Sequence, residues 1–371
     1  MIEIKDVTTK KLLKDYVTFP FSLYKDHPYW VPPLIQDEIE SFDREKNPAF
    51  ETAEAHLYLA YVDNIIVGRI AAIINWNEVN DQHKSKVRFG WWDVIDDIEV
   101  TKALLEKVYE LGRKNSLEHV EGPMGFSNLD KVGVLTEGYD HIGTMITWYN
   151  YPYYVTHLEQ LGYVKEKEFF ESWFPFKDVP DAFTKAQEMI KKRYSLRAAN
   201  FTTTKEIMPY VDEMFELFNT AYANLASFVA VTDSQRAYFK KKYIPFINPE
   251  YIKFVFDKDD KMVAFSIVMP SFSEALQKAK GKLLPFGWYH LLQAKKHSKE
   301  VLFYLIGILP EYQSKGVTAI IFDEYFKTFT KNGIQRCIRT PELEENHAIH
   351  NLWKHFNPEV HRRRKTFRKD L

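Results

Sequence analysis

The sequence predicts an α/β protein that contains two copies of one structural plan. Stretches with the alternation or apolar composition of strands are separated by stretches with the spacing of amphipathic helices. Both halves show the same order of strand, helices, hairpin, strand, helix, strand, helix and strand. A chain of 371 residues is also long enough to build two cores of ordinary size.

The first half begins with an alternating strand at 2–5 and a helical stretch that prolines interrupt up to residue 50. A hairpin follows, in which strands at 56–62 and 65–74 are joined by a turn at Asp63 and Asn64. The further elements expected in this half are a strand at 87–92, a helix at 100–116, a strand at 118–122, a helix at 153–161 and a strand at 169–176.

The second half repeats this order after a break at Lys177–Pro180, which places the boundary within 177–195 and divides the chain into 1–185 and 186–371. Its expected elements are a strand at 196–201, a helix at 209–223, a hairpin of 252–256 and 262–269, a strand at 301–309, a helix at 318–329, a strand at 334–339, a helix at 346–355 and a last strand near Phe367.

Composition and charge restrict the compartment and the partners. The net charge is −1, so no overall field attracts nucleic acid or an anionic membrane, and we expect neither as a partner. The single cysteine, Cys337, excludes an intrachain disulfide and fits a cytoplasmic protein. The first residues lack the apolar core of a signal peptide, and no window approaches 18 apolar residues.

One basic run stands out near the C-terminus, at 361–365, with Arg368 and Lys369 just beyond it. Such a run either binds phosphate groups or forms the exposed part of a final strand, and the sequence leaves both interpretations open. Aromatic residues are also abundant, at 16% of the chain, and this favours a core built on rings over clefts lined by them.

A strand, a short polar loop and a helix follow one another at 305–319. The loop contains small residues at Ser314, Gly316 and Thr318. A strand–loop–helix of this kind directs several backbone N–H groups at one point, where the helix dipole adds positive potential. Gly316 permits close approach of the backbone, and Lys315 adds a charge at the rim. The segment therefore favours binding of an anion such as a pyrophosphate.

This segment resembles the acyl-CoA-binding motif of the GNAT superfamily, with Gln313, Gly316 and Thr318 at its three defined positions. The resemblance continues about 30 residues later, at Asn346, which begins a helix as in the second motif of the family. It implies two tandem GNAT-like domains, each with a central mixed, mostly antiparallel sheet flanked by helices. It also implies acetyl-CoA or another acyl-CoA as co-substrate, with no metal, bound by Ile308, Leu309, Gln313, Ser314, Lys315, Gly316, Val317, Thr318 and Asn346.

The first half resembles the same superfamily more weakly, because the phosphate loop is absent. Its segment 93–99 contains four acidic residues and no glycine, so it would repel a pyrophosphate. The whole chain is similar to a family of bacterial tandem-GNAT proteins of unassigned substrate, on the segments 122–126, 133–140 and 150–154. We therefore expect only the second domain to hold CoA.

The family mechanism is direct attack of an amine on the thioester, whose carbonyl a backbone N–H near Ile308 and Leu309 polarises. The candidates for the base are Glu344, Glu345 and Tyr304. At the position where the family often has a tyrosine that protonates the CoA thiolate, this chain has Trp353. Polar residues of the first half are candidates for an acceptor pocket: Asp130, Glu137, Asn150 and Tyr153.

The resulting hypothesis is an N-acyltransferase that transfers an acyl group, acetyl in the first instance, to the amine of a small molecule. Two alternatives stay open: an acyl-CoA-binding protein without transferase activity, and a transferase that takes its acyl group from an aminoacyl-tRNA. The near-neutral charge argues against the tRNA alternative. The protein is expected to be a monomer or a homodimer.

Overall fold

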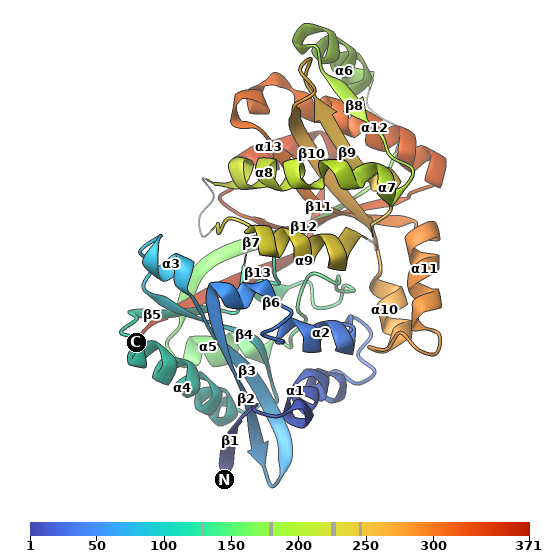
Figure 1. Cartoon of the computed structure of the whole chain (residues 1–371). Coiled ribbons are helices and arrows are strands. Elements are labelled where there is room, and N and C mark those ends of the chain that lie inside the picture. Colours follow the sequence, from blue (N-terminus) through green and yellow to red (C-terminus); the bar gives the residue numbers. More distant parts are fainter. Residues whose placement is uncertain (128, 178–180, 224–227, 245–246) are drawn as a thin grey trace.

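The computed structural model describes residues 1–127, 129–177, 181–223, 228–244 and 247–371. The two halves of the chain form two lobes, the first half below and the second above in Figure 1. A 13-stranded sheet runs through both lobes in the order β1-β2-β3-β4-β5-β13-β7-β12-β11-β10-β9-β8, and β6 pairs with β13 beside this path.

The elements of the first half are β1 (Ile2–Asp6), α1 (Lys10–Leu23), α2 (Ile35–Ser41), η1 (Pro48–Glu51), β2 (Ala53–Val62), β3 (Ile65–Asn75), α3 (Trp76–Asn80), β4 (Lys86–Val94), α4 (Ile98–Lys114), β5 (His119–Gly122), β6 (Val134–Glu137), α5 (Tyr153–Gln160) and β7 (Val164–Pro175). The predicted hairpin is confirmed as β2 and β3, with Val62 opposite Ile65. The amphipathic helix is confirmed as α4, whose first turn Asp97 caps by accepting from the Glu99 N–H.

The elements of the second half are α6 (Asp181–Tyr194), β8 (Arg197–Ala199), α7 (Thr204–Ile207), η2 (Met208–Tyr210), α8 (Val211–Tyr222), α9 (Asp233–Tyr243), η4 (Pro249–Tyr251), β9 (Ile252–Phe256), β10 (Met262–Pro270), α10 (Ser273–Ala279), α11 (Gly287–His297), β11 (Glu300–Ile308), η5 (Pro310–Lys315), α12 (Val317–Asn332), β12 (Arg336–Leu343), α13 (His347–Trp353), η6 (Lys354–Phe356) and β13 (Glu359–Asp370). Sequence periodicity did not predict α6, α9, α10 or α11. Residues 178–180 of the expected break lie outside the described part of the chain.

The two halves exchange their last strands. β7 belongs to the first half in sequence but pairs with β12, and β13 from the end of the chain pairs with β5. β7 and β13 also pair with each other, in antiparallel register from Glu359 opposite Trp173 to Arg368 opposite Val164. The exchange makes the two sheets continuous, so neither half completes its sheet without a strand of the other.

The basic run near the C-terminus lies on β13 in the middle of this sheet, so of the two interpretations left open, that of an exposed strand end is wrong for Arg362 and Arg364. Arg362 and Arg364 are buried, and both face Glu171 of β7. The Arg362 guanidinium is 3.5 Å from that carboxylate, and Arg364 pairs with it directly. Because β13 has a neighbouring strand on each side, its two buried guanidinium groups are stabilised by the Glu171 carboxylate and not by water.

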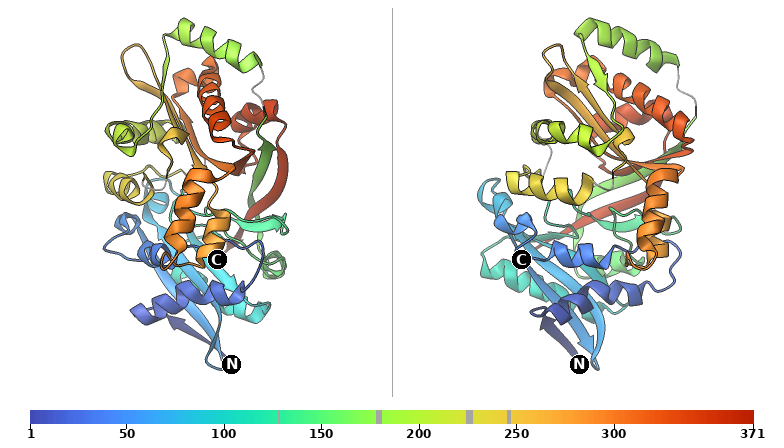
Figure 2. Two further views of the ribbon diagram at one scale, coloured as in Figure 1. Left: turned by 90° about the vertical axis from the view of Figure 1, so that its right-hand side faces the viewer. Right: turned by 45° about the vertical axis from the view of Figure 1, so that its right-hand side comes forward.

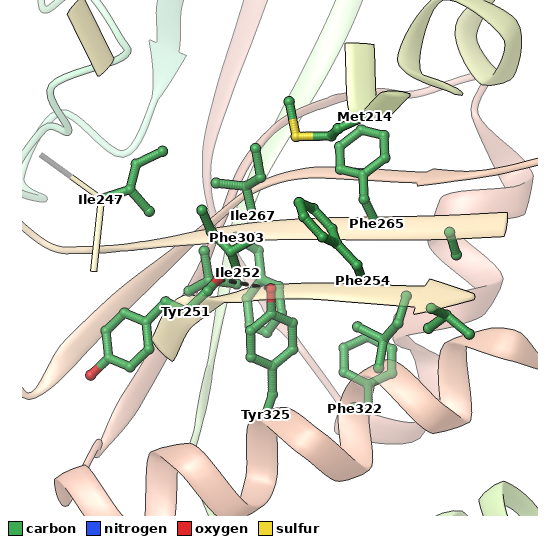
Figure 3. Packing of buried hydrophobic residues seen from close by; sticks show 14 of the residues in the cluster. Met214, Ile247, Tyr251, Ile252, Phe254, Phe265, Ile267, Phe303, Phe322 and Tyr325 are labelled. Atoms are coloured by element: carbon green, nitrogen blue, oxygen red, sulfur yellow. Dashed lines mark hydrogen bonds between the residues drawn. The ribbon is translucent and has the colours of Figure 1, made fainter. Parts of the chain in front are cut away.

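Helices cover both faces of the sheet in each lobe (Figures 1 and 2). Rings fill much of the cores, as the aromatic composition favoured. In the upper lobe, Phe322 and Tyr325 project from α12 toward the strands and contact Phe303, with ring centroids 6.0 and 5.5 Å away (Figure 3). The Tyr325 hydroxyl donates to the Tyr251 carbonyl. Cys337 is buried in this core, where burial raises the pKa of its thiol, so it is a structural residue and not a nucleophile.

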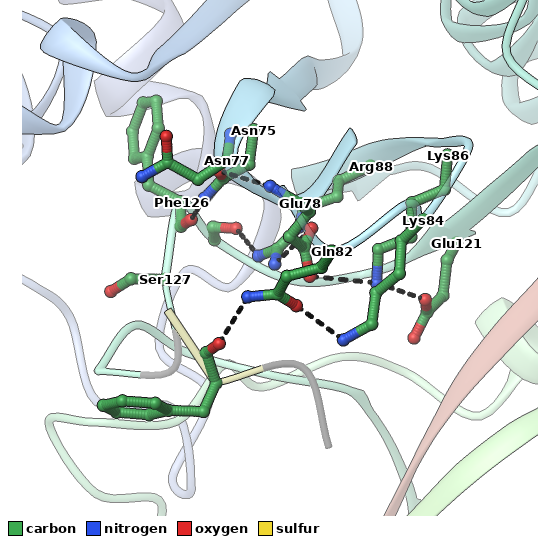
Figure 4. Close-up of polar contacts among 12 residues, drawn as sticks. Asn75, Asn77, Glu78, Gln82, Lys84, Lys86, Arg88, Glu121, Phe126 and Ser127 are labelled. Carbon is green, nitrogen blue, oxygen red and sulfur yellow. Dashed lines mark hydrogen bonds and ion pairs between the residues drawn. The ribbon is translucent and has the colours of Figure 1, made fainter. Parts of the chain in front are cut away.

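Further contacts hold the lobes together besides the exchanged strands. The hairpin of α10 and α11 descends from β10 beside the lower lobe and returns to β11 (Figure 2). On the other side, the Gln82 amide donates to the Phe228 carbonyl at 2.6 Å (Figure 4). None of the helices in the described ranges combines the length and the apolar character that crossing a bilayer requires.

Candidate functional site

β11 and β12 are parallel neighbours that separate halfway along their length. Their pairing runs from Glu300 opposite Arg336 to Phe303 opposite Arg339 and then stops. β12 continues with β7 as its partner, whereas β11 continues to Ile308 beside β10. The last five residues of β11 therefore present one edge of backbone groups to an opening instead of to a neighbouring strand.

A β-bulge lies where this opening begins. Val268 of β10 is opposite Phe303 and Ile267 is opposite Leu305, so Tyr304 has no partner and is the extra residue. A bulge of this kind redirects a side chain and increases the local twist. Phe303 packs toward α12, and Tyr304 lies near Tyr222 of α8.

Backbone polarity along β11 identifies the group that can polarise a carbonyl. The Leu309 N–H donates to the Val263 carbonyl at 3.0 Å, so it is not available, contrary to the expectation that named both residues. Because successive N–H groups of a strand point to opposite sides, the Ile308 N–H faces the opening. The carbonyls on this side are used: Ile306 accepts from the Tyr222 hydroxyl, and Ile308 accepts from the Gln313 amide.

The predicted phosphate loop lies at the same edge, where β11 ends. Residues 310–315 form a short 3-10 helix, and Gly316 begins α12 with φ +72°. This left-handed conformation costs glycine little and other residues more. The side chains of Gln313 and Ser314 are exposed, and the Lys315 ammonium lies 4.2 Å from the Tyr312 ring centroid. Val317 is buried beneath the loop, and Thr318 is half-buried in the first turn.

Helix α6, from the segment between the halves, forms the outer wall of this loop. A Cβ added to Gly316 would lie 2.8 Å from Ile190 Cδ1. Lys191 pairs with Glu324 of α12, and Tyr194 lies under the Lys315 ammonium at 5.2 Å. Sequence periodicity missed this wall because α6 carries few apolar residues and its partner α12 lies more than 100 residues further along the chain.

The residues expected from the second motif lie at the end of β12, at the same edge as the loop. Asn346 is the N-cap of α13 and accepts from the Ile349 N–H, so its side-chain carbonyl already caps a helix. Glu344 and Glu345 are exposed, and Glu344 is 3.9 Å from the Lys165 ammonium. Both carboxylates face solvent, and their role as the base stays a prediction.

Tyr304 and Asp130 come from different halves and interact electrostatically. Burial, the Asp130 charge and Tyr222 raise the pKa of Tyr304, so its phenol keeps its proton at neutral pH. A protonated phenol can donate a hydrogen bond but is not the base that the sequence suggested, and its raised pKa also makes it a weak acid. Burial raises the pKa of Asp130 as well, although the two hydrogen bonds that it accepts from Ser127 act in the opposite direction. A carboxylate with a raised pKa is the better base.

Trp353, which replaces the usual tyrosine, belongs to the core. It is 2% exposed, packs against Phe303 and Phe322, and donates its indole N–H to Glu342 at 2.9 Å. Arg339 pairs with the same carboxylate and lies over the indole, and burial lowers the pKa of Arg339 to about 9. The indole therefore has a structural role, consistent with its inability to protonate a thiolate.

The other acceptor candidates do not lie together. Asn150 accepts from the Leu135 N–H and donates to two carbonyls, and the Tyr153 hydroxyl donates to the Val94 carbonyl. Glu137 is at the surface, 3.2 Å from Arg363. Of the four, Asp130 alone is coupled to the opening.

A pocket lies between the halves, next to Asp130 and Tyr222. Its described lining is mostly apolar and comes from η1, β2, the loop after Phe126, α8 and α9: Ala49, Thr52, Ala53, Asn75, Phe126, Ser127, Leu129, Phe218, Phe228, Val229, Val231, Gln235 and Phe239. Phe218 stacks on Tyr222 at 4.4 Å, and Ser127 holds Asp130, so the pocket adjoins both residues. No sequence pattern indicated it, because its walls come from both halves.

The matching opening in the first half, between β4 and β5, is filled. Arg88 donates to the Gly125 carbonyl and pairs with Glu78, within the charge network of Figure 4. A Cβ on Gly90 would lie 2.3 Å from the Met124 carbonyl oxygen. The chain after β5 thus lies beside β4 where the pairing of β4 with β5 ends.

The polar groups at the end of β4 are also used. The Val94 N–H donates to the Tyr154 hydroxyl oxygen at 2.9 Å, and Asp93 pairs with Arg69 at 2.7 Å. This strand end is acidic and its named polar groups are paired, and the restriction of CoA to the second half stays a prediction.

No family model matches the chain. It is 27% identical over 376 residues to Protein YghO of Escherichia coli, across 99% of this chain and 95% of that protein. It is 25% identical over 319 residues to a Caulobacter vibrioides protein named Bacterial ceramide synthase, across 84% of this chain and 82% of that protein.

Two solved structures share its architecture. A tandem GNAT protein from the clavulanic acid biosynthesis pathway matches with a TM-score of 0.58 at 10% identity, across 100% of this chain and 98% of its own. A GCN5-related N-acetyltransferase from Sphaerobacter thermophilus matches with a TM-score of 0.54 at 9% identity, across 100% and 95%.

The sheet order and these likenesses define an α/β protein in which helices flank a mixed sheet. More narrowly, the chain has the fold of the GCN5-related N-acetyltransferases in its tandem form. The predicted fold class and the predicted GNAT resemblance are thereby confirmed. The division at residues 185 and 186 stays a prediction.

Proposed function

We propose that this protein transfers an acyl group from acyl-CoA to the amine of an acceptor with a long apolar chain. The observation that carries the proposal is the opening between β11 and β12. It places the Ile308 N–H, the bulge residue Tyr304 and the loop at Gly316 on one edge of the sheet. The fold supports an N-acyltransferase kind of activity, and the donor and acceptor are the proposed part.

In this proposal the CoA pyrophosphate lies on the N-terminus of α12, and the thioester enters the opening. The Ile308 N–H donates to the thioester oxygen as negative charge develops there. The amine nitrogen forms the amide bond while the C–S bond breaks. Asp130 accepts the proton of the amine, and Tyr304 donates its proton to the departing thiolate.

Two features support an apolar acceptor. The pocket that adjoins Asp130 is lined mainly by rings and aliphatic side chains, including Phe126, Phe218 and Phe239. In addition, one relative is named a ceramide synthase, and a ceramide is the N-acyl derivative of a long-chain amino alcohol. That acceptor class has an amine and an apolar chain, and the pocket, whose volume is about 10 Å³, would have to widen to receive the chain.

The test is release of CoA thiol by the purified full-length chain, with acyl-CoA donors from acetyl to long-chain. The acceptors are a long-chain amino alcohol and a short-chain amino alcohol with the same head. We expect thiol release and amide product with the long acceptor only. Equal rates with the two acceptors would contradict the role of the pocket. Absence of CoA binding in calorimetry would refute acyl-CoA as the donor.

Binding of CoA without turnover of any acceptor would favour a second function, that of an acyl-CoA-binding protein. The observation behind this alternative is Trp353, a core residue at the place of the usual tyrosine. A catalytic protein needs another proton donor in its place, and Tyr304 is the residue proposed here.

A further inference from the structure

The hairpin of α10 and α11 is held firmly against the lower lobe by one of its faces. Leu276 and Leu291 pack with Val31 and Leu34 of the first half. The Gln277 amide donates to the carbonyls of Pro28 and Trp30, and the Gly281 carbonyl accepts from the Ile35 N–H at 2.9 Å. The hairpin is therefore an ordered part of the molecule, and the direction of its outer face is set by this packing.

The outer face and the tip of the hairpin are apolar and exposed. Six large apolar side chains within residues 283–292 are between 42% and 75% exposed: Leu283, Leu284, Phe286, Trp288, Tyr289 and Leu292. The first three belong to the turn between the helices, and the last three share the outer side of α11. A concentration of exposed rings and leucines in one short segment marks an interaction surface.

Lysines surround this apolar surface, and no acidic residue lies near it in sequence. Residues 275–299 contain six lysines and no aspartate or glutamate, in a chain whose net charge is −1. Lys278, Lys280, Lys282 and Lys296 are exposed, and within the described ranges none of these four forms an ion pair. The segment 275–299 is therefore positively charged, although the net charge of the whole chain is close to zero.

We propose that this hairpin is a membrane anchor that inserts its tip into the headgroup region of a bilayer with anionic phospholipids. Leucine and phenylalanine at the tip enter the acyl boundary, and Trp288 and Tyr289 lie at the depth of the headgroups, where amphipathic rings are favoured. The lysines around them contact anionic headgroups. This differs from the expectation of no membrane partner, which rested on total charge.

The chemistry of the surface favours lipid over the other possible occupants. A second copy of the chain would place Lys280 and Lys282 against the same lysines in a symmetric contact, where like charges repel. The centre of a protein interface is depleted of lysine, whereas a bilayer surface attracts it.

The anchor would also place the catalytic opening close to the lipid phase. The hairpin ends at His297, and β11, which carries Tyr304, begins at Glu300. An acceptor with a long apolar chain partitions into membranes, so the anchor would bring it to the enzyme. The anchor itself rests on the surface alone and does not depend on the proposed transferase activity.

The test is co-sedimentation of the full-length protein with vesicles of phosphatidylcholine, with and without phosphatidylglycerol. We expect binding to the anionic vesicles and weak binding to the neutral ones. The double variant Leu284→Gln/Phe286→Gln should lose binding at least tenfold. Lys280→Gln/Lys282→Gln should lose about 25-fold in low salt, since each lysine near an anionic surface contributes roughly fivefold. All four side chains are exposed, so the fold should survive.

Matched controls separate the surface from general effects. Ile65 is 68% exposed at the tip of the β2–β3 hairpin, as Phe286 is at its own tip, so Ile65→Gln should leave vesicle binding unchanged. Lys10→Gln/Lys11→Gln removes the same charge from the exposed start of α1 and should have little effect.

Three outcomes would overturn the anchor: no binding to anionic vesicles, equal losses in the control variants, or a dimer in sedimentation without lipid that Phe286→Gln converts to a monomer. CoA binding in solution is measured on the same variants. It should be unchanged in all of them, so a failure of the anchor and a failure of the proposed transferase are distinguishable.

Discussion

Glu171 of β7 pairs with Arg364 of β13 at the seam where the two halves exchange strands, and Arg362 shares the same carboxylate. All three side chains are buried. One carboxylate thus neutralises part of the charge of two arginines from the other end of the chain. Loss of that carboxylate would leave two cations in the sheet interior without a partner.

We therefore predict that Glu171→Gln destabilises the protein by about 3–5 kcal/mol, the range for breaking a buried ion pair. The measurement is the free energy of unfolding in urea. Glu166→Gln, an exposed position on the same strand, should change it by less than about 0.5 kcal/mol. A similar small loss at Glu171 would mean that water reaches the seam.

Stability should fall in mild acid because of His361, also at the seam. Burial lowers its pKa from 6.5 to about 4. The charges of Arg362 and His141 also lower it, whereas the charge of Glu171 acts in the opposite direction. The unfolded chain binds a proton on this ring at a pH where the folded chain does not, so stability is complete above 6.5 and is lost as pH falls toward 4. The loss is about 2–3 kcal/mol.

The measurement is urea unfolding between pH 7.5 and pH 4. This pH interval spans the usual pKa of histidine, 6.5, and the pKa of about 4 of His361 in the folded chain. His361→Gln should flatten this part of the profile. Glu171 does not produce the same slope. Burial raises the pKa of its carboxyl, but Arg364 and Arg362 lower it more, so this pKa lies below the usual range and the carboxylate loses its charge only in stronger acid. An unchanged slope in the variant would assign the effect to other groups.

Gly316→Ala should weaken CoA binding, and Gly316→Glu should abolish it. The φ of +72° strains any side chain by about 1–2 kcal/mol, and the new Cβ meets Ile190. Glu would also bring a negative charge to the pyrophosphate. Calorimetry with CoA measures the affinity, and urea unfolding measures the strain.

Gly162 provides the control for this experiment. It has φ +80° and nothing within 4 Å of an added Cβ. Gly162→Ala should therefore carry the same strain and leave CoA affinity unchanged. Equal affinities in the variants at Gly316 would show that the pyrophosphate binds elsewhere.

Tyr304→Phe should lower kcat by about a hundredfold or more and leave the affinity for CoA unchanged, because it removes the proton that the thiolate receives. Thiol release under saturating substrates is the measurement. Tyr325→Phe removes a hydroxyl on the opposite side of β11 that donates to the Tyr251 carbonyl, so it should affect stability and not rate. A rate for Tyr304→Phe within twofold of the natural protein would exclude it as the donor.

The elements with strong local patterns were predictable from the sequence. The hairpin of β2 and β3, the helix α4 and the loop at Gly316 each depend on residues close together in the chain, and the structure has each near its expected bounds. The GNAT likeness followed from motifs of the same local kind. Helix α6 and the α10–α11 hairpin were missed because their apolar faces are narrow and their partners are distant in sequence.

The chemical site could be predicted only in part. Tyr304 and Asp130 were each singled out, but nothing in the sequence relates residues 174 positions apart, and their catalytic roles stay proposals. Burial and the neighbouring carboxylate decide that its phenol stays protonated. The same is true of the pocket, whose walls come from both halves.

The sequence by itself determined the α/β class, the repeated plan and the loop that ends β11, because each follows from periodicity or from residues in direct succession. Only the tertiary structure decided that the final strand with Arg362 and Arg364 lies inside the sheet, and that the halves exchange strands. Strand order and burial arise from contacts between distant segments, and a local pattern holds no information on which distant segment will supply the partner.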